Sequence, residues 1–141
     1  MLKTRGAVDE DDKRMQDNFS VTNKTKGKLP GLPFLEMKET VLGKRYDLSL
    51  VFIGTMRSRT LSKNYKKKDK VSNILSFPID NKSGEIFITP SVAKREAKKF
   101  GKTPKKYIGF LFIHGLLHLK GYPHGSKMNS KEKALSKRFS V

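Results

Sequence analysis

The chain of 141 residues contains no cysteine. Without cysteine no disulfide can form, and no thiolate can bind a metal ion. Any metal site must therefore use histidine, carboxylate or water as ligands. Histidine is itself scarce, since only three are present, and 13 acidic residues stand against 31 lysines and arginines.

Long hydrophobic runs are also missing from the sequence. The longest apolar block, residues 107–119, is too short to span a membrane, which takes about 20 residues. We predict that this block forms a buried helix. Residues 1–20 lack the apolar core of a secretory signal, and we therefore expect a cytoplasmic protein with no membrane partner.

The shortage of acidic residues gives a formal net charge of +18. Residues 1–17 carry five acidic and four basic side chains, a net charge of −1, so residues 18–141 carry +19. The first segment is charged and poor in aliphatic side chains, and we predict a disordered extension over residues 1–17 and one domain over residues 18–141. So basic a domain favours a nucleic acid as its partner over an anionic membrane surface or no specific partner.

Hydrophobic patterning predicts strands and helices in mixed order along the domain. We expect strands at 19–23, 46–54, 72–80 and 84–90, and helices at 34–42, 55–66, 92–100, 103–121 and 126–139. The last two strands should form a hairpin, with Pro78 marking a sheet edge. Met56, Leu61 and Tyr65 should form the apolar side of their helix. This order indicates an α+β fold, a small mixed sheet packed with helices, with the histidine-bearing helix at the centre.

All three histidines, His114, His118 and His124, lie close together in the sequence. His114 and His118 are four residues apart, so both imidazoles can reach one metal ion from a single helix face. Gly121 accepts the positive φ that ends a helix, and the chain can then turn back and present His124. Three histidines leave one position of a tetrahedral Zn²⁺ open, as in catalytic zinc sites. The alternative, three unrelated structural histidines, leaves their clustering unexplained.

The residue after His114 distinguishes this pattern from that of metalloproteases. The metalloprotease helix reads H-E-x-x-H, and its glutamate is the general base. Gly115 occupies that position here. Peptide hydrolysis would therefore lose a proton shuttle that is typically worth about 10²–10⁴-fold in rate, which makes a metal-dependent peptidase the less favoured reading.

Three stretches, in the same order, resemble the YbeY family of bacterial endoribonucleases. HGLLHLKGYPH at residues 114–124 is similar to the family's H-G-x-L-H-L-x-G-Y-D-H. LSKNYKKKDKVSNILSFP at residues 61–78 is similar to its L-N-x-x-Y-R-x-K-D-K-x-T-[DN]-V-L-S-F-P, and GEIFI at residues 84–88 to its G-D-[IL]-x-I. The resemblance implies a single-domain α+β metalloprotein that binds one zinc ion through His114, His118 and His124. It also implies metal-dependent cleavage of single-stranded RNA, with roles in the maturation of small-subunit ribosomal RNA and in ribosome quality control.

The sequence departs from the family pattern at two positions. Pro123 stands where the family has an aspartate before the third histidine, and proline can neither orient a ligand nor shuttle a proton. Lys66 stands where the family has an arginine, and it keeps the positive charge but loses the two-pronged contact to phosphate.

These observations give a set of candidate site residues. We expect His114 and Lys66 to be catalytic, and a basic run to contact RNA phosphates; that run comprises Arg59, Lys63, Lys66, Lys67 and Lys68. Ser76 and Glu85 are candidates for orienting a zinc-bound histidine; the alternatives are an ordinary strand hydroxyl for Ser76 and a surface charge for Glu85.

The preferred hypothesis is a zinc-dependent endoribonuclease acting on ribosomal RNA, with the small ribosomal subunit as its partner. A non-catalytic, ribosome-associated RNA-binding protein with a structural zinc is the alternative. Three protein ligands instead of four argue against a structural zinc site.

Overall fold

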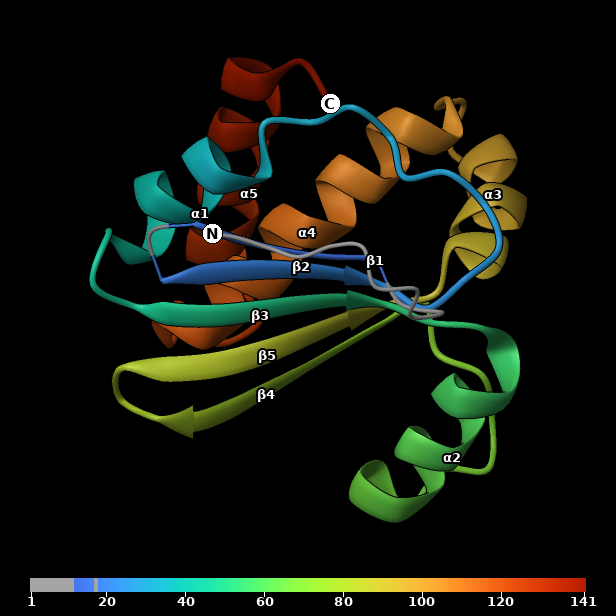
Figure 1. The fold of residues 1–141 in the computed structure, drawn as a ribbon. Helices are drawn as coiled ribbons and strands as arrows, with labels where there is room; N and C mark the ends of the chain where they lie inside the picture. The colour runs from blue at the N-terminus through green and yellow to red at the C-terminus, as the bar shows by residue number, and fades with distance from the viewer. Residues whose placement is uncertain (1–11, 17) are drawn as a thin grey trace.

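A computed structural model of the protein describes residues 12–16 and 18–141, which form five strands and five helices (Figure 1). The strands are β1 Asp12–Gln16, β2 Phe19–Asn23, β3 Asp47–Phe52, β4 Ile74–Asp80 and β5 Ser83–Ile88. The helices are α1 Phe34–Leu42, α2 Thr55–Lys66, α3 Pro90–Lys99, α4 Pro104–Lys120 and α5 Ser126–Phe139. The predicted α+β class is confirmed.

The five strands form one mixed sheet in the order β1-β2-β3-β5-β4. The inner pairs β2–β3 and β3–β5 are parallel, and the outer pairs β1–β2 and β4–β5 are antiparallel. The predicted hairpin of β4 and β5 is confirmed, and β4 is an edge strand. Pro78 fits there because it has no N–H to give to a further strand.

The histidine-bearing helix α4 lies at the centre of the fold, as predicted. Figure 1 shows α1, α3, α4 and α5 on one side of the sheet, and α4 packs against α1, α3, α5, β4 and β5. The core between α4 and the sheet is made of fully buried side chains such as Phe112 and Leu116 from the helix and Leu50 and Ile86 from the strands. Among the described residues, no helix is both long and apolar enough to cross a membrane.

The structure differs from the sequence prediction at the N-terminus. Asp12–Gln16, which we expected to be disordered, form β1 and pair with β2. Strand pairing uses backbone N–H and C=O groups, so a charged segment can form an edge strand. The rest of the expected extension, residues 1–11 and 17, lies outside the described residues.

The prediction for the buried side of α2 is wrong for Met56 and Tyr65, whereas Leu61 is half-buried. Met56 and Tyr65 are 84% and 66% exposed, whereas Ser58 and Ser62 are fully buried. The hydroxyl of Ser58 donates to the carbonyl of Ser72 at 3.0 Å, and the Ser62 hydroxyl lies 2.7 Å from that of Ser72. Small hydroxyl side chains let the following loop approach α2 closely, so hydrogen bonds attach the loop to the buried side of the helix.

Candidate metal centre

Helix α4 positions the first two histidines. The Thr103 side chain accepts a hydrogen bond from the Lys106 backbone N–H at 3.2 Å, and Pro104 occupies the first turn. These residues begin the helix. His114 and His118 are four residues apart, so they fall on one face near its C-terminal end. Both side chains are partly buried.

The turn after α4 brings in the third histidine. Gly121 has φ +108°, which favours glycine, and its backbone N–H bonds to the carbonyls of Leu117 and His118. The Tyr122 N–H also bonds to the Leu117 carbonyl, at 3.1 Å. This closed turn reverses the chain and places the exposed His124 ring 4.5 Å from the His118 ring, centroid to centroid.

The three histidines form one cluster, as the sequence predicts. One ring nitrogen from each lies within 4.8 Å of the others, and the Nε2 atoms of His114 and His118 are 3.0 Å apart. Ligands at 2.0–2.1 Å in a tetrahedral zinc site are about 3.4 Å from one another. The cluster therefore fits one metal ion after small rotations of the rings.

A carboxylate that sequence reasoning missed orients His114. The Nδ1 atom of His114 lies 2.5 Å from Oε2 of Glu132 on α5, and the Glu132 side chain is only 13% exposed. With the Nδ1–H donating to this carboxylate, the lone pair of His114 Nε2 is directed at the cluster. A histidine oriented by a carboxylate is the common arrangement around protein-bound zinc.

Burial favours the neutral form of His118. Burial lowers the pKa of His118, and the neighbouring His114, His124 and Lys66 lower it further, while Glu132 opposes the shift. A neutral imidazole is the form that binds a metal. The electrostatic environment thus suits a metal ligand.

Comparisons with known proteins agree with this geometry. A family model described as Endoribonuclease YbeY matches residues 12–140. The chain belongs to the YbeY family. The Endoribonuclease YbeY of Campylobacter jejuni subsp. jejuni is 34% identical over 116 residues, which cover 77% of this chain and 86% of the relative. That of Staphylococcus carnosus is 31% identical over 107 residues, which cover 67% and 70%.

One solved structure supports the fold. The solution structure of a protein from Thermotoga maritima matches with a TM-score of 0.57 and 24% identity, covering 75% of this chain and 78% of the other.

Packing explains the glycine at position 115. A Cβ atom at Gly115 would lie 2.8 Å from Cδ1 of Ile74 and 2.9 Å from Oγ of Ser76. A larger side chain at this position would therefore have to displace the side-chain ends of Ile74, Ser76 and Ile86 between α4 and the sheet. The glutamate that a metalloprotease carries after its first histidine would need this part of the core to repack.

Lys66 connects α2 to the histidine cluster. It is the last residue of α2, and its charge contributes to the lowered pKa of His118 after burial and the two other histidines. Its Nζ lies 5.6 Å from the centre of the Phe77 ring, within cation–π range. Lys66 is thus the member of the predicted basic run whose charge helps to lower the pKa of His118.

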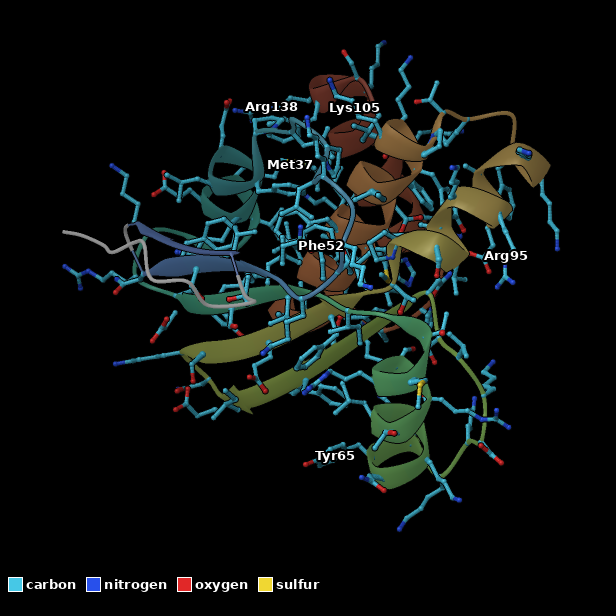
Figure 2. The ribbon with its side chains drawn as sticks, turned by 45° about the vertical axis from the view of Figure 1, so that its right-hand side comes forward. Met37, Phe52, Tyr65, Arg95, Lys105 and Arg138 are labelled. Atoms are coloured by element: carbon cyan, nitrogen blue, oxygen red, sulfur yellow. The ribbon has the colours of Figure 1, made fainter. Side chains whose placement is uncertain are left out.

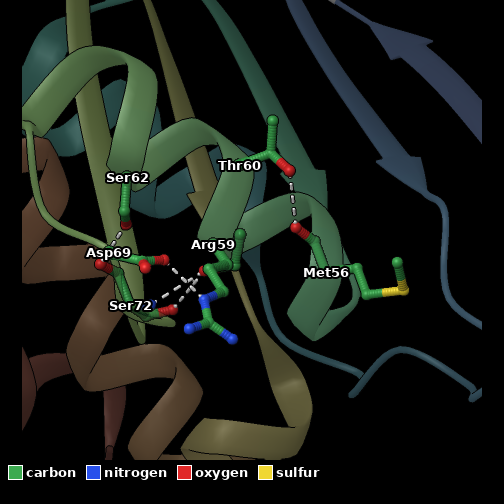
Figure 3. A network of polar contacts seen from close by, with 7 residues as sticks. Met56, Arg59, Thr60, Ser62, Asp69 and Ser72 are labelled. Atoms are coloured by element: carbon green, nitrogen blue, oxygen red, sulfur yellow. Dashed lines mark hydrogen bonds and ion pairs between the residues drawn. The ribbon is translucent and has the colours of Figure 1, made fainter.

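The other residues of the basic run lie on α2 and the loop after it. Lys63, Lys67 and Lys68 are exposed. Arg59 forms an ion pair with Asp69, in which the Arg59 Nε donates to the Asp69 carboxylate at 2.7 Å. This hydrogen bond lowers the pKa of the Asp69 carboxyl. Figure 3 shows this pair beside the Ser62–Ser72 contact, and together they bind the basic loop to α2.

The two strand candidates lie on opposite faces of the sheet. Ser76 is next to Gly115, beneath α4. Glu85 lies between Gly84 and Ile86, which are buried toward Leu119 and Gly115 of α4, so strand alternation directs Glu85 to the other face. Glu132, and not Glu85, contacts a histidine of the cluster.

Proposed function

We propose that this protein is a zinc-dependent endoribonuclease that cuts single-stranded RNA. Its substrate is small-subunit ribosomal RNA, and it acts in the cytoplasm in association with the small ribosomal subunit. Its roles are the maturation of this RNA and the quality control of ribosomes. One observation carries the proposal: a three-histidine cluster in which Glu132 orients His114, in a chain that matches the family described as Endoribonuclease YbeY.

The histidines and Glu132 would bind and orient the metal. His114, His118 and His124 would supply three imidazole nitrogens, and Glu132 would fix the tautomer of His114. Bound zinc supplies Lewis acidity there, either polarising a phosphate oxygen or lowering the pKa of water toward about 7. Three ligands leave a coordination position for this chemistry.

Lys66 and the basic residues of α2 would bind the RNA backbone. The Lys66 ammonium lies near the cluster and can neutralise charge on the scissile phosphate. Lys63, Lys67 and Lys68 extend the positive surface along α2 and its loop. The net charge of +18 favours binding to a polyanion.

The test compares metal-free and zinc-loaded protein on the same RNA molecules. We expect zinc-loaded protein to cut single-stranded RNA, with a precursor of the small-subunit ribosomal RNA cut faster than an unrelated strand of equal length. Metal-free protein and the His114→Ala, His118→Ala double variant should not cut. Equal cleavage by all three preparations would contradict the proposal.

Pro123 supports one alternative, a non-catalytic RNA-binding zinc protein. The family pattern has an aspartate at this position, and proline removes that carboxylate from the neighbourhood of the third histidine. RNA binding without cleavage at full zinc occupancy would favour this alternative.

A further inference from the structure

An exposed aromatic ring lies beside the predicted catalytic lysine. Tyr65 is a large hydrophobic side chain that is nonetheless 66% exposed, and in Figure 2 it stands out from α2 below the strands. Its ring centre is 5.4 Å from that of Phe77, and Phe77 lies 5.8 Å from Phe87. The three rings form a row that runs from the sheet to solvent.

Lys66 joins this aromatic row to the histidine cluster. The Lys66 ammonium rests 5.6 Å from the centre of the Phe77 ring. Phe77 follows Ser76, whose hydroxyl lies against Gly115 beside His114. Phe77 pairs with Glu85 and points to the other face of the sheet, so the path from the row to the cluster runs around the edge strand β4. A strand of RNA that passes Lys66 at the edge of β4, with one phosphate at the cluster, would therefore have a nearby nucleotide at the Tyr65 ring.

The chemistry around Tyr65 fits a base of single-stranded RNA. A nucleobase is flat and apolar on its faces, and it stacks on exposed aromatic rings without regard to sequence. The phosphates on either side of that base need cations, and Lys63, Lys66 and Lys67 lie within two residues of Tyr65 in the sequence. An exposed ring among lysines is less suited to an apolar protein partner, which would have to desolvate those charges.

We infer that Tyr65, supported by Phe77 and Phe87, is a stacking subsite for one unpaired base of the RNA next to the scissile phosphate. This inference rests on the proposed function, because it assigns the subsite to the substrate of the histidine cluster. The ring would hold the nucleotide, and Lys66 would bind the phosphate that follows.

The experiment measures binding of two oligonucleotides of about ten nucleotides, a length within the range that single-strand binding folds cover. Both carry 2′-O-methyl riboses so that they are not cut, and one lacks its bases while keeping every phosphate. Wild-type protein should bind the base-bearing strand about tenfold more tightly than the abasic strand. Tyr65→Ala should lose most of this preference and keep its affinity for the abasic strand.

Two further variants separate stacking from a structural role of Tyr65. Tyr65→Phe keeps a flat ring and should keep the preference. Tyr65→Leu still covers Phe77 but offers no flat face, so it should lose the preference while thermal unfolding stays close to that of the wild type. If Tyr65→Leu binds like the wild type, Tyr65 only covers Phe77 and the inference is overturned.

Phe100 provides a matched control. It is 63% exposed, it stacks on Tyr107 with ring centres 5.5 Å apart, and Lys98 and Lys99 precede it. Tyr107 is eleven residues before His118 on α4, a helix rise of about 16 Å. Phe100→Ala should therefore keep the preference for the base-bearing strand. If Phe100→Ala loses as much of this preference as Tyr65→Ala does, any exposed ring of the protein can bind a base and Tyr65 is not a specific subsite.

The outcomes for the subsite and for the nuclease are distinct. Wild-type protein that binds both strands equally, or a Tyr65→Ala variant that keeps the full preference, overturns the subsite whether or not RNA is cut. A preference that depends on Tyr65, in a zinc-loaded protein that cuts no RNA, supports the subsite and contradicts the proposed function.

Discussion

The His114 Nδ1 atom and the Glu132 Oε2 atom lie 2.5 Å apart, although 18 residues separate them along the chain. The contact joins α4 to α5, and it leaves His114 Nε2 directed at the two other histidines. Because the carboxylate accepts a hydrogen bond from the imidazole and holds its orientation, Glu132 should govern how tightly the cluster binds a metal.

We predict that Glu132→Gln lowers zinc affinity about 10- to 100-fold. The variant keeps the size of the side chain but loses its charge, so the effect reports the charged hydrogen bond. Competition with a chromophoric chelator measures the affinity. Glu36→Gln is the control, since Glu36 is an exposed carboxylate in the first turn of α1; equal affinities for the two variants would contradict the assigned role.

Gly115 gives a prediction about stability. A side chain at this position meets Ile74 Cδ1 and Ser76 Oγ, so Gly115→Glu should destabilise the protein by several kcal/mol and confer no peptidase activity. Gly115→Ala should cost less, about 1–2 kcal/mol, because alanine stabilises helices while its methyl group crowds Ile74.

The Gly115 prediction can be checked through a compensating change. Ile74→Val removes the Cδ1 atom that the new methyl group would meet at 2.8 Å. In denaturant unfolding, the double variant should therefore be more stable than the sum of the two single losses implies. Strict additivity would show that this contact does not limit residue 115.

The histidine cluster was predictable from the sequence because its signals are local. Thr103 and Gly121 mark the ends of α4 by their capping chemistry, and the four-residue spacing puts His114 and His118 on one face. The structure confirms all of these features. The exposed side of α2 was not predictable in the same way, because it depends on hydrogen bonds from Ser58 and Ser62 to a loop that follows the helix.

Glu132 shows why part of the site lay beyond sequence reasoning. It stands between two lysines in a basic helix, and nothing in that local pattern distinguishes it from a solvated charge. Its role arises only because α5 folds back against α4. Strand alternation, in contrast, was enough to argue that Glu85 and Ile86 occupy opposite faces, once Ile86 is recognised as buried.

Lys66 and Lys67 are neighbours with different expected roles. Lys66→Ala should slow RNA cleavage about tenfold, because Lys66 lies near the cluster and over Phe77. Lys67→Ala should slow it less, since Lys67 is an exposed residue at the C-terminal cap of α2. Single-turnover rates at saturating RNA would compare them, and equal losses would mean that the basic run acts only as bulk charge.

We predict that the folded protein loses stability in alkaline solution when Tyr107 ionises. Burial first, and then its hydrogen bond to Glu96, raise the pKa of Tyr107 to about 12. Unfolded tyrosine ionises near 10, so the stabilisation is complete below about pH 10 and is lost as the pH rises toward 12. Tyr107→Phe should therefore cost about 1–2 kcal/mol at pH 8, and the difference from wild type should shrink above pH 10.

Denaturant unfolding of both proteins between pH 8 and pH 11.5 tests the Tyr107 prediction. Glu96→Gln is the informative partner variant, because it removes the carboxylate to which the Tyr107 hydroxyl donates at 2.9 Å. Its pH dependence should be weaker than that of wild type. A constant difference between wild type and Tyr107→Phe across this range would contradict the mechanism.

The final prediction concerns acid and Pro123. Zinc binds neutral imidazoles, and burial together with the neighbouring histidines lowers the pKa of His118, so His118 stays neutral to a lower pH than an ordinary histidine. We expect metal retention, and RNA cleavage with it, to fall as the pH drops below roughly 6. Pro123 lies in the exposed turn before His124 and offers no carboxylate that could add a second acid-side titration. The acidic limb of the rate profile should therefore follow zinc content alone.

Replacing Pro123 separates two roles for this position. Pro123→Asp restores the family carboxylate, and Pro123→Ala removes the rigid ring without adding a charge. If Pro123 serves mainly to fix the turn that presents His124, both variants should bind zinc more weakly, and neither should cut RNA faster than wild type at equal zinc occupancy. We expect this result because zinc already lowers the pKa of water toward about 7 without a further carboxylate. Faster cleavage by Pro123→Asp than by Pro123→Ala and wild type, at matched occupancy, would instead identify a catalytic base that this sequence lacks.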